Sequence, residues 1–226
     1  MTKNPLVQVL AIDQYEKANK STSKDYPSIE LVRLEKLFFK GKKGKVLEYA
    51  FGSGCNTKHL LKKNYTVFGI DVSKNAIINL KKKLKNKKIK KKLKLFLLNR
   101  NTKKIPFKSK TFDYVVAMSI LSLLGSKQKI TYLLKELNRV LKKDGKIILD
   151  INDQNSEFSK NNLTKKKNLF LSKIMDKKIY TYCVNSSIDF KKLVNPYFKI
   201  VDVGFSAHKV FGRRIKEFII CGIKKD

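Results

Sequence analysis

Two carboxylates and two glycines in the first third of the chain have the types and spacing of a ligand site. Glu48 lies in the apolar run before Gly52 and Gly54 in "KVLEYAFGSGCNTKHLL", and Asp71 ends the next apolar run, "YTVFGID". Glycines at the end of a strand let the backbone approach a ligand, and a following helix points free N–H groups toward it. A carboxylate placed like Asp71 accepts hydrogen bonds from both hydroxyls of a ribose. The pattern predicts a site for an adenosine-containing cofactor.

The identity of that cofactor depends on detail, because the spacing from Gly52 to Asp71 suits a nicotinamide dinucleotide equally well. Two features disfavour a dinucleotide. The third glycine of G-x-G-x-x-G falls at Thr57, and the carboxylate of Glu48 would repel a pyrophosphate. A cofactor with cationic ammonium and sulfonium groups gains from the same acid.

Few other side chains offer chemistry, so no catalytic residue is assigned. We expect His59, on the helix after the glycines, to be a half-buried structural residue. His208 lies in a terminal strand, where a surface role and a place facing an acceptor stay equally open. Cys55 has no evident cationic partner in the sequence, which favours a small residue in a tight turn over a nucleophile.

The elements that must position these residues alternate between strands and helices. Short β-branched and aromatic runs predict strands at 45–51, 65–71, 94–98, 112–119 and 145–151. Apolar residues at helical spacing predict helices at 28–39, 56–64, 73–84 and about 127–141. Such alternation predicts a parallel sheet with helices on both faces.

The last third of the chain breaks this alternation. It contains a strand at 178–184, a short helix at 187–195, and strands at 198–210 and 215–223 joined through "FGRR". Strands joined by so short a loop must pair antiparallel. We therefore predict an α/β fold with a Rossmann-like, doubly wound, mostly parallel seven-stranded sheet that ends in an antiparallel hairpin.

Length and pattern favour a single domain over residues 1–226. Residues 1–40 are expected to form an N-terminal helical cap or lid, and 152–185 a substrate-side insertion. Tyr15, Tyr26 and Lys20 are candidates to close over the cofactor, the alternative being that they only pack.

The formal net charge of +34 points by itself to nucleic acid or another anionic surface. Lysine is spread over helix faces, loops and the C-terminus, whereas only five residues are arginine, the better side chain for phosphate recognition. We therefore interpret the charge as a solvated lysine surface.

Cysteine usage and hydropathy address the compartment. Three widely spaced cysteines indicate neither a disulfide framework nor a metal site, and no stretch has the length of a membrane span or the form of a signal peptide. The expectation is a soluble, cytoplasmic protein without a metal.

In order and spacing, these motifs resemble the class I S-adenosylmethionine-dependent methyltransferases, with a domain similar to methyltransferase types 11 and 25, over most of the chain. The family's acid followed by x-G-x-G-x-G matches Glu48, Ala50, Gly52 and Gly54, with alanine at the first glycine. Its ribose-binding acid matches Asp71 in "GIDVS". The resemblance implies S-adenosyl-L-methionine as cofactor. A bulky residue at Gly54 is then expected to abolish binding by clashing with ligand and turn while the fold survives.

Two further segments extend the resemblance. In "NTKKIPFKSKTFDYVVAMSIL", Asn101 stands where a family acid often contacts the adenine amino group, and "ELNRVLKKDGKIIL" is similar to the family's helix and turn into the fifth strand. Val72, Thr102 and Met118 are further cofactor contacts that the resemblance implies.

The implied reaction is in-line displacement at the sulfonium methyl by a nucleophile that the enzyme positions. A small-molecule acceptor is favoured, because no RNA-binding module is present and "AMSIL" stands where amino-group methylases have Asn-Pro-Pro-Tyr. Two alternatives stay open. One is an RNA methyltransferase that uses the lysine surface with Arg213 and Arg214, and the other is a non-catalytic cofactor- or nucleic-acid-binding protein, which Ala50 and Asn101 would favour.

Overall fold

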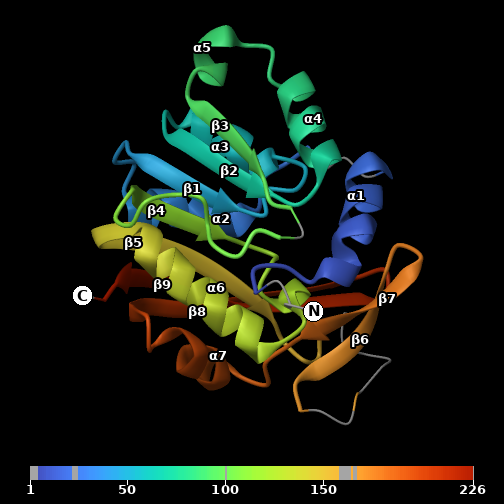
Figure 1. Cartoon of the computed structure of the whole chain (residues 1–226). Coiled ribbons are helices and arrows are strands. Elements are labelled where there is room, and N and C mark those ends of the chain that lie inside the picture. The colour runs from blue at the N-terminus through green and yellow to red at the C-terminus, as the bar shows by residue number, and fades with distance from the viewer. Residues whose placement is uncertain (1–4, 22–24, 100, 158–163, 165–166, 226) are drawn as a thin grey trace.

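A seven-stranded sheet forms the centre of the molecule, in the order β3-β2-β1-β4-β5-β9-β8 (Figure 1). The computed structural model describes residues 5–21, 25–99, 101–157, 164 and 167–225. The first five strands pair in parallel, and β9 pairs antiparallel with both β5 and β8. The predicted fold class is confirmed. The strands are β1 (Lys45–Tyr49), β2 (Thr66–Asp71), β3 (Leu93–Leu97), β4 (Phe112–Ala117), β5 (Leu141–Asn152), β8 (Phe198–Val210) and β9 (Arg213–Lys224).

Helices cover both faces of this sheet. On one face, α6 (Lys127–Val140) and α7 (Ser187–Val194) bury their apolar stripes, and on the other α2 (Ile29–Leu34), α3 (Cys55–Lys62) and α4 (Lys74–Lys83) do so. The short α5 (Lys87–Lys90) and the 3-10 turn η3 (Ser122–Leu124) complete the connections. Burial of each large aliphatic side chain contributes about 1.5 to 3 kcal/mol, so these stripes hold the layers together. Within the described residues, no helix combines the length and apolarity needed to cross a membrane.

The segment predicted as one helix at 28–39 divides into α2 and a π-helical turn, η2 (Glu35–Phe39). Both ends of that turn are buried in the core: the Tyr65 hydroxyl donates to Glu35 at 2.8 Å, and the Phe39 ring lies 4.3 Å from that of Tyr114. The wider turn directs both side chains inward. Apolar spacing alone did not predict it.

A second, two-stranded sheet lies in the predicted substrate-side insertion. β7 (Lys177–Tyr182) agrees with the strand expected at 178–184, but its antiparallel partner β6 (Leu169–Ile174) was not predicted. Residues 158–163 and 165–166 of the insertion lie outside the described part of the chain.

The N-terminal segment lies over the carboxyl ends of the parallel strands, as a cap. It comprises η1 (Val9–Ala11) and α1 (Ile12–Ser21), and Figure 1 shows α1 between α4 and the β6–β7 hairpin. The Gln8 amide donates to the carbonyl oxygens of Leu123 (3.1 Å) and Tyr180 (2.8 Å). This segment falls within residues 1–40, the range expected to form a cap or lid, of which residues 1–4 and 22–24 are not among those described.

A partly buried ion pair joins α6 to the loop that precedes β4. Arg139 Nε and Nη2 donate to the two carboxylate oxygens of Glu136, each at 2.8 Å, and Nη1 and Nη2 donate to the carbonyls of Phe107 and Ile105. Glu136 also accepts the Ile105 N–H at 2.9 Å. The pair therefore satisfies three backbone groups of this loop at once.

We predict that Arg139→Leu lowers the free energy of unfolding by about 2 kcal/mol, because it leaves the buried Glu136 carboxylate without its cation. Urea denaturation measures this loss. The exposed neighbour Lys135 provides the control, since Lys135→Ala should change stability by less than about 0.5 kcal/mol. Equal effects of the two substitutions would contradict a structural role for the pair.

Candidate active site

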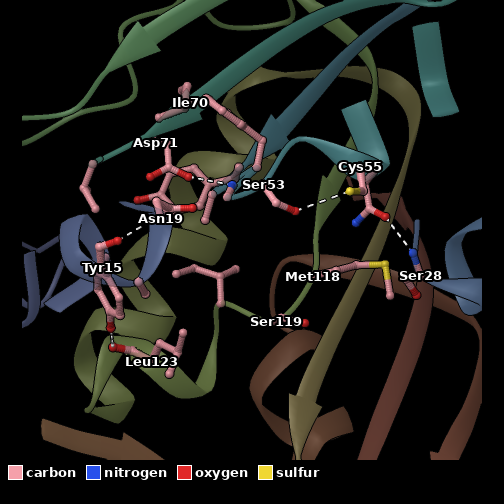
Figure 2. Close-up of a pocket in the computed structure, with 18 of the residues that line it drawn as sticks. Tyr15, Asn19, Ser28, Ser53, Cys55, Ile70, Asp71, Met118, Ser119 and Leu123 are labelled. Atoms are coloured by element: carbon pink, nitrogen blue, oxygen red, sulfur yellow. Dashed lines mark hydrogen bonds between the residues drawn. The ribbon is translucent and has the colours of Figure 1, made fainter. Parts of the chain in front are cut away.

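A cavity of about 490 Å³ opens at the carboxyl ends of the parallel strands, beneath the N-terminal cap (Figure 2). The strand order reverses at β1, and in such sheets ligands bind at the edge where it reverses. The volume of the cavity lies in the range of small-molecule sites. The lining includes Leu6, Tyr15, Asn19, Tyr26, Ser28, Ala50, Gly52, Ser53, Cys55, Asp71, Val72, Leu98, Met118, Ser119 and Leu123.

Asp71 is the carboxylate in the cavity wall. It is 5% exposed and accepts hydrogen bonds from the backbone N–H groups of Gly52 (2.8 Å) and Ser73 (2.9 Å). Burial raises the pKa of this carboxyl, and these backbone hydrogen bonds act against the rise. Because each carboxylate oxygen has two acceptor positions, both can still receive a ligand hydroxyl.

The loop after β1 contains three residues in the left-handed region, with φ of 61° at Ala50, 52° at Gly52 and 77° at Gly54. Only glycine adopts this region without steric cost, so Ala50 holds a strained position that costs roughly 1 to 2 kcal/mol. Its N–H donates to the Ile70 carbonyl at 2.7 Å, which fixes the loop against the end of β2. This is where the chain departs from the expected glycine pattern.

The two glycines of the loop have different surroundings. A Cβ atom on Gly54 would lie 2.5 Å from Leu80 Cδ1, whereas on Gly52 the nearest atom would be Asn19 Oδ1 at 4.0 Å. Gly54 contacts α4, and Gly52 faces the cavity. The expectation that a side chain at Gly54 would spare the fold is therefore wrong, because the clash is with the core residue Leu80.

Glu48 is not among the lining residues described. It is 3% exposed and accepts a hydrogen bond from the Thr57 hydroxyl on α3. Burial raises the pKa of this carboxyl to about 8. The structure thus places Glu48 behind the glycine loop, where it ties β1 to α3, rather than in the cavity wall.

The remaining expected cofactor contacts divide into two groups. Val72 and Met118 line the cavity, but Asn101 and Thr102 do not. The Asn101 N–H and the Thr102 hydroxyl both donate to Asn99 Oδ1, at 2.8 and 3.1 Å, in an exposed turn after β3. Leu98 is the residue of this segment that reaches the cavity.

The cap contributes aromatic residues to the wall. The Tyr15 hydroxyl donates to the Leu123 carbonyl at 3.1 Å, which fixes the ring at the cavity's edge (Figure 2). Tyr26 also lines the cavity, although it is 86% exposed. Lys20 is exposed and is not part of the described lining.

The two histidines lie away from the cavity lining. His59 packs beside Glu35, with 3.7 Å between His59 Nε2 and Glu35 Oε2, and burial lowers its pKa. This agrees with the structural role expected for it. His208 is exposed on β8, and Cys55 is buried in the cavity wall, where it accepts a hydrogen bond from Ser53 at 3.4 Å.

The cavity is poor in cations. No lysine or arginine is among the described residues that line it, although the chain contains 52 basic residues. Arg214 is exposed at the β8–β9 turn, and the side chain of Arg213 lies outside the described part of the structure. Among the described residues, no group of three or more His, Cys, Asp or Glu side chains is placed so that it could hold a metal ion.

Sequence reasoning did not find Asn19, Ser28 or Ser119, which come from separate loops and helices and meet only through the fold. Figure 2 shows Asp71 and Asn19 toward one side of the cavity, and Met118 and Ser28 toward the other. Nothing in the local sequence marks these residues. The cavity is therefore assembled from the cap, the ends of four strands and the segment before α2.

The family comparison identifies a methyltransferase domain model that matches residues 47–149. A search of the curated proteins found no significant match to this sequence. The matched segment contains the glycine loop, Asp71 and the strands up to β5. It therefore contains the strand ends on which the cavity is built.

Solved structures share the fold over nearly the whole chain. An S-adenosylmethionine-dependent methyltransferase from Methanosarcina mazei has 21% identity and a TM-score of 0.68, over 80% of this chain and 92% of that chain. The N-methyltransferase NodS from Bradyrhizobium japonicum WM9, in complex with S-adenosyl-L-homocysteine, has 11% identity and a TM-score of 0.66, over 99% and 100%. The CcbJ methyltransferase from Streptomyces caelestis has 12% identity and a TM-score of 0.67, over 99% of each chain. At these identities the likeness is one of fold.

We predict that Gly54→Ala destabilises the protein much more than Gly52→Ala. Both substitutions cost about 1 kcal/mol through the positive φ, but Gly54→Ala adds the contact with Leu80. Thermal unfolding of the two variants, side by side, measures the difference. Equal melting temperatures would contradict the assignment of Gly54 to the core.

Glu48 generates a prediction about pH. Its pKa is raised from 4.5 to about 8, so the folded state binds the extra proton and wild-type stability falls as pH rises between these values. Glu48→Gln keeps an acceptor for Thr57 and carries no charge. We expect the variant and the wild type to be similar near pH 5 and the variant to be more stable, by about 3 to 4 kcal/mol, near pH 8.5. A constant difference across this range, in urea denaturation, would argue against a neutral Glu48.

Proposed function

We propose that this chain is a class I S-adenosylmethionine-dependent methyltransferase that transfers a methyl group to a small-molecule acceptor. The observation that supports this acceptor is the cavity itself. It has about 490 Å³ of space, is covered by the N-terminal cap, and has no lysine or arginine among its described lining residues. An RNA substrate favours an open, basic trough instead.

The residues present fit the cofactor. We place the ribose hydroxyls on Asp71, whose two oxygens are buried at the cavity wall and oriented by backbone N–H groups. Gly52 lets the backbone approach the methionine part, and Val72 and Leu98 offer apolar contact for the adenine. Glu48 supports the loop through Thr57. Asn101 and Thr102 follow Leu98 in the chain and are proposed contacts at the adenine end.

Met118 and Ser119 then lie toward the acceptor, because they follow β4, on the side of β1 opposite to β2. The cofactor supplies an activated sulfonium methyl group. The chain's own contribution is to hold the acceptor in line with that group and to exclude water. Leu6, Val7 and Leu123 give the cavity an apolar roof for this purpose.

Glu48 and Asp71 both have raised pKa values, and neither is required as a catalytic base. A base is needed only when the acceptor must lose a proton in the transition state. We therefore assign no catalytic residue and attribute the rate to proximity and orientation.

The three cysteines are free and buried, which fits a reducing cytoplasmic compartment.

Binding of S-adenosylmethionine tests the cofactor site. Asp71→Ala removes two charge-assisted hydrogen bonds to the ribose and loosens the Gly52 loop, so we expect at least tenfold weaker binding by calorimetry. Asp202→Ala, at an exposed position on β8, is the matched control and should bind as the wild type does. Unchanged affinity in a folded Asp71→Ala variant would refute the site.

Transfer of tritium from labelled cofactor tests the acceptor class. We expect label in a small-metabolite extract and none above background in total RNA at physiological salt. Binding to RNA should be weak and steeply salt-dependent, since scattered lysines contribute only counterion release. Label in RNA alone would establish the RNA alternative instead.

A further inference from the structure

Three carboxyl groups converge behind the acceptor side of the cavity. Asp150 on β5 and Glu217 on β9 lie on the same face of the sheet, because Ile148 and Ile219, two positions from each, share one core cluster. Glu30 lies in the first turn of α2, whose Leu31 packs into that cluster. We call Glu30, Asp150 and Glu217 the acidic cluster.

Asp150 is the buried member, at 1% exposure. Its Oδ1 accepts the Ser119 N–H at 2.6 Å, whereas its Oδ2, buried as well, has no hydrogen-bond partner among the described residues. Burial raises the pKa of Asp150 well above its usual value, and the charges of Glu217 and Glu30 add to the rise. This burial favours the neutral form of Asp150, and a cation bound nearby would favour the ionised form instead.

Glu30 connects the acidic cluster to the cavity. Its carboxylate accepts hydrogen bonds from Ser28 and Ser206, both at 2.7 Å. Burial acts to raise the pKa of Glu30, but these two hydrogen bonds, its own backbone N–H and the charge of Arg33 together hold it below the usual value, so the group stays ionised at neutral pH. Ser28 and Ser119 both line the cavity. The ionised carboxylate of Glu30 thus lies directly behind Ser28 of the cavity wall, beside the place proposed for the acceptor.

The surrounding charge makes this arrangement informative. The chain has 52 basic and only 18 acidic residues, yet the described cavity lining contains no lysine or arginine and the carboxyls gather at this wall. In a low-dielectric site, one ionised carboxylate favours a cation and disfavours an anion by far more than it would in water. The cavity therefore has the opposite electrostatic preference to the outer surface.

We propose that the acceptor is a cationic amine whose protonated nitrogen binds at Ser28 and Ser119, with its charge balanced by the acidic cluster. This inference rests on the proposed function and adds the substrate's charge class to it. The three carboxyls act as positioning residues. The protonated nitrogen is an anchor and need not be the atom that is methylated.

The test sorts methylated products by charge. Wild-type protein is incubated with tritium-labelled cofactor and a small-metabolite extract, the residual cofactor is removed, and the label is separated on cation- and anion-exchange resins against a control without enzyme. We expect at least tenfold more label in the cation-exchange fraction. Label mainly in neutral or anionic small molecules overturns the amine proposal while the proposed function stands. Label in no small molecule, or in RNA alone, overturns both.

Variants then connect this preference to the acidic cluster. For the labelled cationic acceptor, Glu30→Gln should raise KM at least tenfold with a smaller change in kcat, and Asp150→Asn, which keeps an acceptor for the Ser119 N–H, should also raise KM. Asp202→Asn is the control, because Asp202 is an exposed acid on β8, in the same β8–β9 hairpin as Glu217. Circular dichroism and S-adenosylmethionine binding verify that each variant is folded. If folded Glu30→Gln and Asp150→Asn keep the wild-type KM, the acidic cluster does not position the acceptor.

Discussion

The site depends on one carboxylate, Asp71, that accepts two backbone N–H groups from different segments. The Gly52 N–H belongs to the loop after β1, and the Ser73 N–H belongs to the turn from β2 into α4. Joining them fixes the spacing of two strand ends, at which the cavity begins. Because the carboxylate is buried, its hydrogen bonds are costly to lose, and the loop therefore has one preferred position.

The cap is built on the same turn. Ser73 caps α4 by accepting the Ala76 N–H at 3.0 Å, and Glu16 of α1 accepts the Asn75 N–H at 3.1 Å. Asn79 of α4 donates to the Asn19 carbonyl of α1 at 2.7 Å. The first turns of α4 thus contact both the turn that contains Ser73, next to Asp71, and helix α1 of the cap. The same helix therefore holds the cavity wall at Asp71 and the cap above it.

The sequence predicted the sheet well, because its strands are apolar runs bounded by turn residues and its helices bury stripes at helical spacing. It did not predict β6, whose residues follow a lysine-rich stretch and, within the described part of the chain, form a two-stranded sheet with β7. It also did not reveal that Gly54 packs on Leu80 or that Glu48 bonds Thr57, since both contacts join different elements. Residue types at the site could thus be predicted, whereas the direction of each side chain required the packing of α3 and α4.

Two strained residues flank the cavity, and they have a common cause. Ala50 after β1 and Ser119 after β4 adopt positive φ values of 61° and 57°, and each donates its N–H to a neighbouring strand, to Ile70 and to Asp150 respectively. Such backbone costs roughly 1 to 3 kcal/mol per residue and persists only where the surroundings determine it. At Ala50 the hydrogen bond holds the loop beside Asp71. At Ser119 the acceptor of the hydrogen bond is the buried carboxyl of Asp150, which belongs to the acidic cluster. A carboxyl group therefore shapes each side of the cavity, one proposed to bind the cofactor and the other to position the acceptor. The backbone strain at Ala50 and Ser119 arises because the chain turns at the ends of both β1 and β4 toward the cavity between them.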